Sequence, residues 1–268
     1  MVVIRLASAQ QALGHEVSVL GYQAGEQEDD RSREELSSTP GGENLKLHLC
    51  PARDRRETLV GAAARAMAEQ VLPAHDFVHL HGVWETILRV TATVSRAHTV
   101  PYAVAPHGML DPWSMSQKKF KKRIALTLGY RKMLDRAAFL HCLNQDEAAL
   151  IKPLRLKAPP QIIPNGVFRS EVDPLPEAGV FRREHPELKD DPFVLFLSRL
   201  HYKKGLDFLA DAFAQVAGEL TNLRLVIAGP DGGAQSEFEQ RIAACGLTDR
   251  AHVIGPIYGR QKYAAMVD

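Results

Sequence analysis

The sequence predicts an α/β fold built on parallel sheets, and two observations carry this prediction. The apolar runs Val194–Leu197 and Leu225–Ala228 are continuous rather than alternating, which indicates strands that are buried on both faces. These runs alternate along the chain with helical patterns, such as the one at 206–220, where apolar residues recur every three or four positions. Strands that alternate with helices form parallel sheets with helices on both sides.

The first half of the chain alternates predicted helices and strands. A first helix stops at Gly14, and the strand Glu16–Tyr22 follows it. Asn144 and Glu147 have the spacing of a capping box that starts a further helix. We interpret the charged segment Glu26–Glu35 as a solvated loop. The remaining helices of this half are expected at 57–71, 84–98 and 117–137, and the remaining strands at 45–49, 77–81, 102–106, 138–143 and 161–167.

The domain organisation follows from a change in composition. Residues 1–168 are expected to form the first domain, 192–268 the second, and 169–191, rich in Pro, Glu and Arg, a linker with one short helix. In the second domain, Ser236 and Glu239 have capping-box spacing and Gly246 ends the helix that they start. Two such domains are expected to leave a cleft at the carboxyl ends of their strands.

The composition excludes several classes of protein. It is ordinary for a soluble globular chain, with 45% hydrophobic and 24% charged residues, and a net charge of +1 gives no general attraction to nucleic acid. No apolar run reaches the ~18 residues of a membrane-spanning helix, and Arg5 interrupts the first apolar stretch, unlike in a signal peptide. Cys50, Cys142 and Cys245 match neither a disulfide framework nor a zinc pattern. We therefore expect a cytoplasmic location.

The most informative candidate site is the loop that carries Arg199 and Lys204. It follows the predicted strand Phe193–Leu197 and precedes a helix, and ligands of open α/β sheets bind at the carboxyl ends of strands. A helix N-terminus offers unpaired N–H groups and a positive potential, and two cations beside it suit a diphosphate. The alternative is that these residues are solvated loop cations.

A second group of candidates lies at other strand ends. His107, beside Gly108 and directly after a buried strand, is suited to donate a hydrogen bond to a sugar hydroxyl or to developing negative charge, although a lone histidine is often structural. The turn Gly229–Gly233 also follows a buried strand, and its glycines would let a ligand approach the backbone. It is not the GxGxxG pattern of dehydrogenases.

Two further patterns have a functional interpretation and a purely structural one. His79 and His81 point to the same side of one strand, but no carboxylate or cysteine cluster completes a metal site, so no metal is predicted. The segment Lys118–Arg123 places five cations in six residues. It suits an anionic acceptor or an anionic lipid surface, or it is simply a solvated helix face.

Six motifs, in their order along nearly the whole chain, resemble the family 4 glycosyltransferases. The resemblance implies the GT-B fold of two Rossmann-like domains, and a retaining transfer of a sugar from a nucleotide-sugar to a saccharide or lipid-linked acceptor. PHGML, with the basic helix after it, resembles enzymes of surface or exopolysaccharide assembly, so peripheral contact with an anionic membrane surface is expected. The motifs are ALGHEVSVL, APHGML, IIPNGV, SRLHYKKG, LRLVIAGPDGG and HVIGPI.

The resemblance also implies roles for particular residues. Arg199 and Lys204 would hold and neutralise the donor diphosphate, which is electrostatic catalysis. His107 would contact the transferred sugar, and Gly108 and Gly229 would belong to the donor site. No metal or other cofactor is expected, because two cations and a helix end would do its work. The acceptor side would be formed by Trp84, Lys118, Lys119 and Lys122.

The sequence departs from the family pattern at both ends. Family members begin with a strand and a glycine-rich loop, whereas this chain starts within the first helix. They also carry two glutamates, eight residues apart, after the helix that here begins near Arg260. We therefore expect a chain truncated at both ends, with an incomplete second domain. A non-catalytic nucleotide-sugar-binding or scaffold protein is the alternative hypothesis, and a sugar-nucleotide epimerase, which shares the GT-B architecture, is a third.

Overall fold

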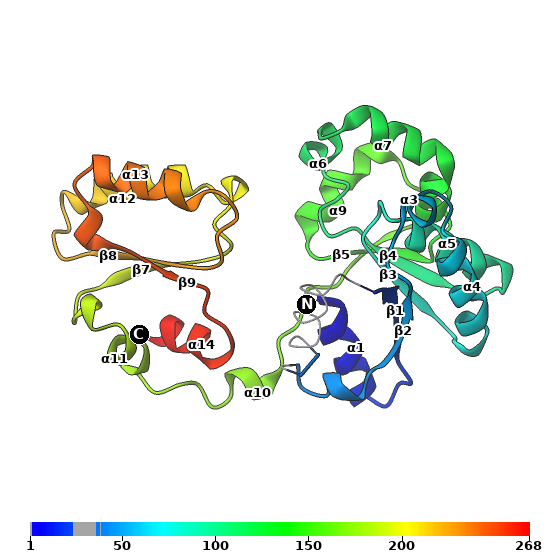
Figure 1. Ribbon diagram of the computed structural model, residues 1–268, viewed down its shortest axis with the longest axis horizontal. Helices are drawn as coiled ribbons and strands as arrows, with labels where there is room; N and C mark the ends of the chain where they lie inside the picture. Colours follow the sequence, from blue (N-terminus) through cyan, green and yellow to red (C-terminus); the bar gives the residue numbers. More distant parts are fainter. Residues whose placement is uncertain (1, 24–35, 38) are drawn as a thin grey trace. The chain divides into compact units, whose positions relative to one another are not determined.

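The structure is a computed structural model that describes residues 2–23, 36–37 and 39–268. The chain divides into two compact units, residues 1–166 and 167–268, which are described separately (Figure 1). The solvated loop predicted at 26–35 lies outside the described residues. Every strand pair in both units is parallel, as the continuous apolar runs predicted.

The first unit holds two groups of paired strands. In one group, β1 (Ser18–Tyr22) pairs with β2 (Lys46–Cys50). The other is a four-stranded sheet in chain order, formed by β3 (Val78–His81), β4 (Tyr102–Ala105), β5 (Phe139–Cys142) and β6 (Pro160–Ile162). Residues of β4 are buried along its whole length, as expected for a strand in the middle of a covered sheet.

The two faces of the four-stranded sheet differ in chemistry. Leu80, Val104 and Leu140 lie in register on β3, β4 and β5, and all three belong to the main apolar core of the unit. Because side chains alternate along a strand, His79 and His81 are on the opposite face. The helices of this unit are α1 (Val2–Ala12), α3 (Arg55–Val60), α4 (Ala62–Val71), α5 (Thr86–Ala97), α6 (Pro112–Ser116), α7 (Lys119–Ala125), α8 (Arg131–Asp135) and α9 (Gln145–Ile151).

Two helices predicted as continuous are broken at a glycine. The helix expected at 57–71 is divided into α3 and α4 by Gly61, whose φ of 74° is left-handed. A side chain at Gly61 would also collide with Thr86, since its Cβ would lie 2.7 Å from the threonine Cγ2. The helix expected at 117–137 is interrupted between α7 and α8 at Gly129, with a φ of 104°. Helical periodicity continues through both breaks, so the pattern alone does not reveal them.

Of the two predicted capping boxes, only the first N-cap is confirmed. Oδ1 of Asn144 accepts a hydrogen bond from the Glu147 amide at 2.7 Å, at the start of α9. In the second unit, α13 (Gln235–Ala244) begins before Ser236, so this serine is inside the helix. Oδ1 of Asp231 accepts from the Gln235 amide at 3.3 Å instead, and the prediction for Ser236 and Glu239 was wrong.

The second unit is a three-stranded sheet with helices on both faces, as predicted. In Figure 1, α12 (Leu206–Ala217) and α13 cover one face of the sheet, and α11 (Val180–Glu184) and α14 (Gly259–Val267) cover the other. Each face has its own apolar core. The strands, in order across the sheet, are β7 (Phe193–Leu197), β8 (Arg224–Ala228) and β9 (Ala251–Gly255).

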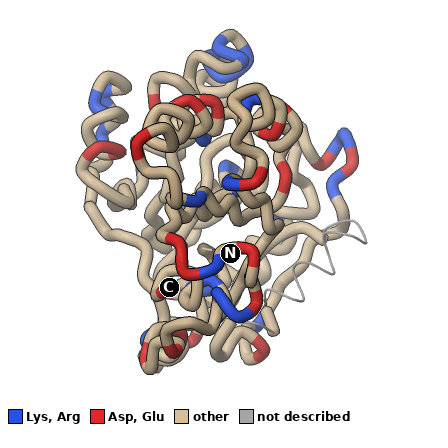
Figure 2. The backbone as a smooth tube through the Cα atoms, turned by 90° about the vertical axis from the view of Figure 1, so that its left-hand side faces the viewer, with Lys and Arg blue, Asp and Glu red and all other residues tan. Residues whose placement is uncertain are grey.

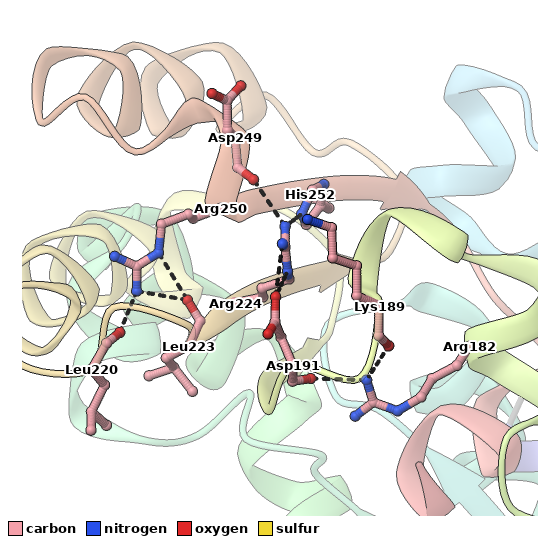
Figure 3. Close-up of polar contacts among 9 residues, drawn as sticks. All are labelled: Arg182, Lys189, Asp191, Leu220, Leu223, Arg224, Asp249, Arg250 and His252. Carbon is pink, nitrogen blue, oxygen red and sulfur yellow. Dashed lines mark hydrogen bonds and ion pairs between the residues drawn. The ribbon is translucent and has the colours of Figure 1, made fainter.

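The segment interpreted as a linker at 169–191 is part of the second unit in the structure. It contains α10 (Arg169–Val172) and α11, and Phe181 is fully buried in the core beneath α14. Arg182 donates to the carbonyl oxygen of Asp191 at 2.8 Å, and the Asp191 carboxylate accepts from Arg224 on β8 at 2.8 Å (Figure 3). The apolar residues of segment 169–191 are too sparse to form a periodic pattern. Only these tertiary contacts show that the segment is folded.

Candidate active site

The predicted cationic loop connects β7 to α12 and is exposed at both cations, Arg199 and Lys204. Neither side chain has a hydrogen bond or ion pair to any residue that the structure describes. A 3₁₀ turn at Tyr202–Lys204 leads into α12, and Gly205 precedes the helix with a φ of 68°. No side chain caps α12 at its N-terminus. Two cations without a described partner therefore lie in the loop that leads directly into the uncapped amides of α12. This is a suitable environment for an anion.

The glycine-rich turn after β8 is fastened to this loop. Leu200 donates its amide to Pro230 at 2.9 Å and accepts at its carbonyl from the Gly232 amide at 2.7 Å. A Cβ on Gly229 would lie 1.9 Å from the Ser198 carbonyl oxygen. The close approach that Gly229 permits in the structure is therefore that of the neighbouring loop backbone, which holds the cationic loop in place.

His107 and Gly108 form the centre of a tight turn at the end of β4. Their φ angles are 50° and 71°, and the Met109 amide donates to the Pro106 carbonyl at 3.0 Å. Two consecutive positive φ angles with this hydrogen bond correspond to a type I′ turn. Glycine takes the second central position without strain, whereas the histidine is held in a conformation that non-glycine residues seldom adopt.

Glu147 holds this turn and was singled out from the sequence only for its spacing from Asn144. Its Oε1 accepts from the Gly108 amide at 2.7 Å, and its Oε2 accepts from the Leu143 amide at 2.7 Å. The residue is buried, with 9% of its surface exposed. One carboxylate therefore joins the end of β4 to the end of β5, a contact between residues 39 positions apart that spacing along the sequence could not reveal.

Four histidines, from strands β3 and β5 and from the turn itself, meet at this point. Nδ1 of His81 lies 3.0 Å from Nε2 of His107, and the two rings are nearly parallel, with an interplanar angle of 13°. Nδ1 of His141 lies 3.1 Å from Nε2 of His79, whose ring also packs against His81. Nε2 of His141 donates to the Ile163 carbonyl at 2.7 Å. We call His79, His81, His107 and His141 the histidine cluster.

Small residues on the middle strand make room for the histidine cluster. Ala103 and Ala105 of β4 are the register partners of His79 and His81 and are fully buried. Because alanine fills little space above the sheet, rings from β3 and β5 can reach each other across β4. The sequence analysis singled out His79, His81 and His107. It did not single out His141, because the approach of this residue depends on the order of the strands in the sheet.

Burial favours the neutral form of His79, His81 and His107 by lowering the pKa of each. Loss of solvation, followed by the neighbouring histidines, lowers the pKa of His79 to about 4 and that of His81 to about 3. Burial also lowers the pKa of His107, although the negative charge of Glu147 acts in the opposite direction. The rings can therefore serve as hydrogen-bonding groups, but they are poor sites for a positive charge.

The cluster is not arranged as a metal site. Within residues 2–23, 36–37 and 39–268, no group of three or more His, Cys, Asp or Glu side chains is placed to hold a metal ion. The facing nitrogens are at hydrogen-bond distance from one another, so their lone pairs and protons are already used.

The candidate acceptor-side residues divide into two pairs. Trp84 donates its indole N–H to the Met109 carbonyl at 3.3 Å, and Nζ of Lys122 lies 5.3 Å from the centre of the Trp84 ring. These two residues are thus placed beside the His107 turn. Lys118 and Lys119 are exposed at the start of α7, and neither side chain has a hydrogen bond or ion pair to a described residue of that turn.

The basic segment also exposes apolar side chains. Phe120 on α7 and Leu128 just after it are 77% and 65% exposed, and Trp113 on α6 is 44% exposed. In Figure 2, cations form an almost continuous blue run at the top of the view, where α7 lies. Among the helices that the structure describes, none combines the length and apolar character needed to cross a bilayer. We call Trp113, Lys118–Arg123 and Leu128 the basic apolar surface.

Comparison with known proteins gives two family matches that follow the two units. Residues 1–166 match the model of the glycosyl transferase 4-like domain, and residues 179–267 match that of glycosyl transferases group 1. Two curated relatives are similar over shorter stretches. Alpha-D-kanosaminyltransferase of Streptomyces kanamyceticus is 37% identical over 27% of this chain and 19% of its own length. The gpi3 subunit of phosphatidylinositol N-acetylglucosaminyltransferase from Schizosaccharomyces pombe is 29% identical over 44% of this chain and 23% of its own length.

Solved structures share the fold at low sequence identity. HepE of Anabaena, crystallised with UDP and glucose, has a TM-score of 0.67 and 18% identity, over 99% of this chain and 67% of HepE. A UDP-N-acetylglucosamine 2-epimerase has a TM-score of 0.57 and 14% identity, over 95% of this chain and 65% of the epimerase. The GT-B architecture predicted from the sequence is confirmed by these likenesses. With matched family models over both units, the chain belongs to the family of glycosyl transferase 4-like and group 1 glycosyltransferases.

Proposed function

We propose that this protein works as a retaining glycosyltransferase that moves a sugar from a nucleotide-sugar donor to a saccharide or lipid-linked acceptor, in the synthesis of surface or exopolysaccharides. The observation that carries the proposal is the exposed pair Arg199 and Lys204, without partners among the described residues and next to the uncapped start of α12. Exposed cations beside free amides are suited to the two phosphates of such a donor.

In this proposal each candidate residue has one role. Arg199 and Lys204 neutralise the charge that develops on the leaving diphosphate, so no metal is required. His107 donates a hydrogen bond to the transferred sugar, and Gly108 keeps the turn in the conformation that presents it. Gly229 acts indirectly, because it lets the β8 turn support the cationic loop. Trp84 and Lys122 lie nearest the His107 turn and contact the acceptor.

Relatives support this choice of substrates. The ligands of HepE are UDP and glucose, which are the parts of a nucleotide-sugar. The S. pombe relative is named for a phosphatidylinositol acceptor, which favours a lipid-linked acceptor for this chain. This chain matches only part of the length of those relatives.

We further propose that the protein works at the cytoplasmic face of a membrane and rests there through the basic apolar surface. Lys118, Lys119, Lys121 and Arg123 are exposed and suit anionic headgroups, and each cation near such a surface contributes about 1 kcal/mol. Phe120 and the other exposed apolar side chains would insert between the headgroups. A surface of this kind brings the enzyme to a lipid-linked acceptor.

The direct test is turnover by the complete gene product. It is mixed with UDP-, GDP- and ADP-sugars and a membrane fraction. Two quantities are then measured: the amount of nucleoside diphosphate released and the anomeric configuration of the product. Release with retained anomeric configuration is expected. No turnover of any nucleotide-sugar would overturn the proposal.

The same protein and nucleotide-sugars also distinguish two alternative functions. A non-catalytic nucleotide-binding or scaffold protein would bind nucleoside diphosphate in a calorimetric titration, or nothing at all, without turnover. An epimerase shares this fold, as the TM-score of 0.57 shows, and would convert its nucleotide-sugar without any acceptor. Dependence of product formation on the acceptor therefore distinguishes transfer from epimerisation.

A further inference from the structure

We propose that Lys122 is a positioning residue for the turn that carries His107. Through Ser114, its ammonium group fastens the basic segment to the carbonyl oxygen of Met109, which is the last residue of that turn. The proposal rests on the proposed function only for the reaction that His107 serves. It is separate from the contact of Lys122 with the acceptor.

Lys122 differs in its surroundings from the rest of the basic run. It is half-buried, whereas the other four cations of the segment Lys118–Arg123 are exposed. Its Nζ lies 2.6 Å from the Ser114 carbonyl oxygen and 3.2 Å from Ser114 Oγ. The same Nζ lies 5.3 Å from the centre of the Trp84 ring, within the range of a cation–π contact. This one lysine therefore connects α7 to α6 and to the loop after β3.

The chemistry of the groups fixes the direction of each hydrogen bond. An ammonium group can only donate, and a carbonyl oxygen can only accept. The Ser114 hydroxyl lies between Nζ of Lys122 and the Met109 carbonyl, so it accepts from the lysine and donates to Met109 at 3.1 Å. The indole N–H of Trp84 donates to the same carbonyl at 3.3 Å. Both donors to the Met109 oxygen are thus groups that Lys122 contacts.

The Met109 carbonyl is at the end of the turn that presents His107. Met109 closes this turn, since its amide donates to the Pro106 carbonyl at 3.0 Å with His107 and Gly108 between them. His107 has a φ of 50°, a backbone conformation that a residue other than glycine keeps only where its surroundings hold it. By holding Met109, Lys122 contributes to those surroundings.

Loss of the ammonium group should therefore reach the site indirectly. Without it, the Ser114 hydroxyl loses one of the two partners that orient it toward Met109, and the Trp84 ring loses the cation beside it. A displacement of about 1 Å in a positioning group can cost about a hundredfold in rate. The effect should appear in kcat, because the geometry of the reacting groups changes, and not only in affinity for the acceptor.

The first test observes the site by NMR and does not depend on turnover. The chain has two tryptophans, so Trp113→Phe assigns their indole N–H signals, and His107→Asn assigns the His107 ring. Lys122→Met should shift the signals of both the Trp84 indole and the His107 ring, and Lys122→Arg, which keeps a cation and its donors, should restore them. Lys132→Met, at an exposed lysine of α8, is the control and should shift neither. An unchanged His107 signal in Lys122→Met would overturn the proposal.

A second variant tests the link through Ser114 with every cation in place. Ser114→Ala removes the hydroxyl between Lys122 and Met109, and it should shift the His107 signal in the same direction as Lys122→Met. Ser116→Ala is the matched control, because Ser116 lies on the same helix and its hydroxyl donates to the carbonyl of Trp113 at 2.7 Å. A Ser114→Ala spectrum like that of the control would also overturn the proposal.

Kinetics of the complete protein separate a positioning role from a contact with the acceptor alone. Lys122→Met should lower kcat by about tenfold or more with little change in the KM of the donor, and Lys122→Arg should recover most of that loss. A higher KM of the acceptor with kcat retained would contradict a positioning role. If the NMR signals respond as expected but no nucleotide-sugar is turned over, the proposed function fails and the link between Lys122 and the turn stands.

Discussion

Oε1 of Glu147 lies 2.7 Å from the amide nitrogen of Gly108, and through this contact a residue at the start of α9 holds the turn that carries His107. The second carboxylate oxygen is occupied by the Leu143 amide. Glu147 therefore connects the ends of two strands with one buried side chain. It is the residue of the candidate site whose importance depends most on tertiary contacts.

Replacing Glu147 should destabilise the first unit. In Glu147→Gln one oxygen becomes an NH₂ group that cannot accept from a backbone amide, and a buried unpaired N–H costs about 1–3 kcal/mol. Chemical denaturation should show that loss, together with reduced turnover by the complete protein. Glu69→Gln, which removes an exposed partner of His98, is the control and should change stability by less than about 1 kcal/mol. Equal stability of the two variants would show that the Glu147 contact is unimportant.

Removal of either cation in the loop after β7 should weaken nucleotide binding. Arg199→Ala and Lys204→Ala are each expected to reduce the binding free energy for a nucleoside diphosphate by ~1–3 kcal/mol, as for hydrogen bonds to charged groups. Calorimetric titration at two salt concentrations measures this effect. The control is Arg241→Ala on α13, an exposed cation paired with Asp211 and Glu237. Unchanged affinity in both loop variants would remove the loop from the donor site.

A methyl group on Gly229 should damage the same site without touching a cation. Its Cβ would lie 1.9 Å from the Ser198 carbonyl oxygen, so the two loops must separate. We expect Gly229→Ala to lose about 1–3 kcal/mol of stability, the usual cost of overpacking, and to bind diphosphate more weakly. Gly218→Ala is the matched control: Gly218 has a helical backbone, and its Cβ would make only an ordinary contact at 3.7 Å. A Gly229→Ala variant that behaves like the control would mean that the loops are not fastened together in solution.

The histidine cluster should make the first unit sensitive to acid. His79 has a pKa of about 4 in the folded chain, against about 6.5 for an unperturbed histidine, so the unfolded state binds more protons between these values. Stability is thus complete above about pH 6.5, falls as the pH decreases to about 4, and levels off below that. His79→Gln, which keeps a donor toward His141, should reduce this acid-induced loss by at most about 3 kcal/mol. Denaturation midpoints at pH 7, 5 and 4 measure it, and an unchanged pH dependence would show that His79 is not buried as described.

Contact with a membrane should depend on both the cations and the apolar side chains of the basic apolar surface. The double variant Phe120→Ser, Leu128→Ser should reduce binding to phosphatidylglycerol vesicles by about tenfold or more, since burying each side chain contributes about 1.5–3 kcal/mol. Phe208→Ser is the matched control, because Phe208 on α12 is 76% exposed and Phe120 77%. Co-sedimentation with anionic and with phosphatidylcholine vesicles separates the two contributions. If neither vesicle binds the unmodified protein, the membrane proposal fails.

Much of the architecture was accessible from the sequence, because it depends on local patterns. Continuous apolar runs predicted parallel strands, and the run Leu225–Ala228 is buried as expected, whereas Val194 on β7 is exposed. The glycine and cap signals placed the ends of several helices, including the N-cap at Asn144. The loop with Arg199 and Lys204 was predicted between a strand and a helix, and it lies there. These features are determined by residues close together along the chain.

The remaining features depend on contacts between distant residues, and only the tertiary structure decided them. Phe181 makes the segment interpreted as a linker part of a core, because that core also includes Val226 of β8 and Ala264 of α14, which are distant in the sequence. His141 joins His79 because β3 and β5 flank a strand of small residues, and Glu147 reaches Gly108 because both lie at strand ends. The sequence by itself supplied the candidate residues for the chemistry proposed here. The packing of separate strands decided how those side chains are held, since hydrogen bonds across a sheet leave no periodic trace along the chain.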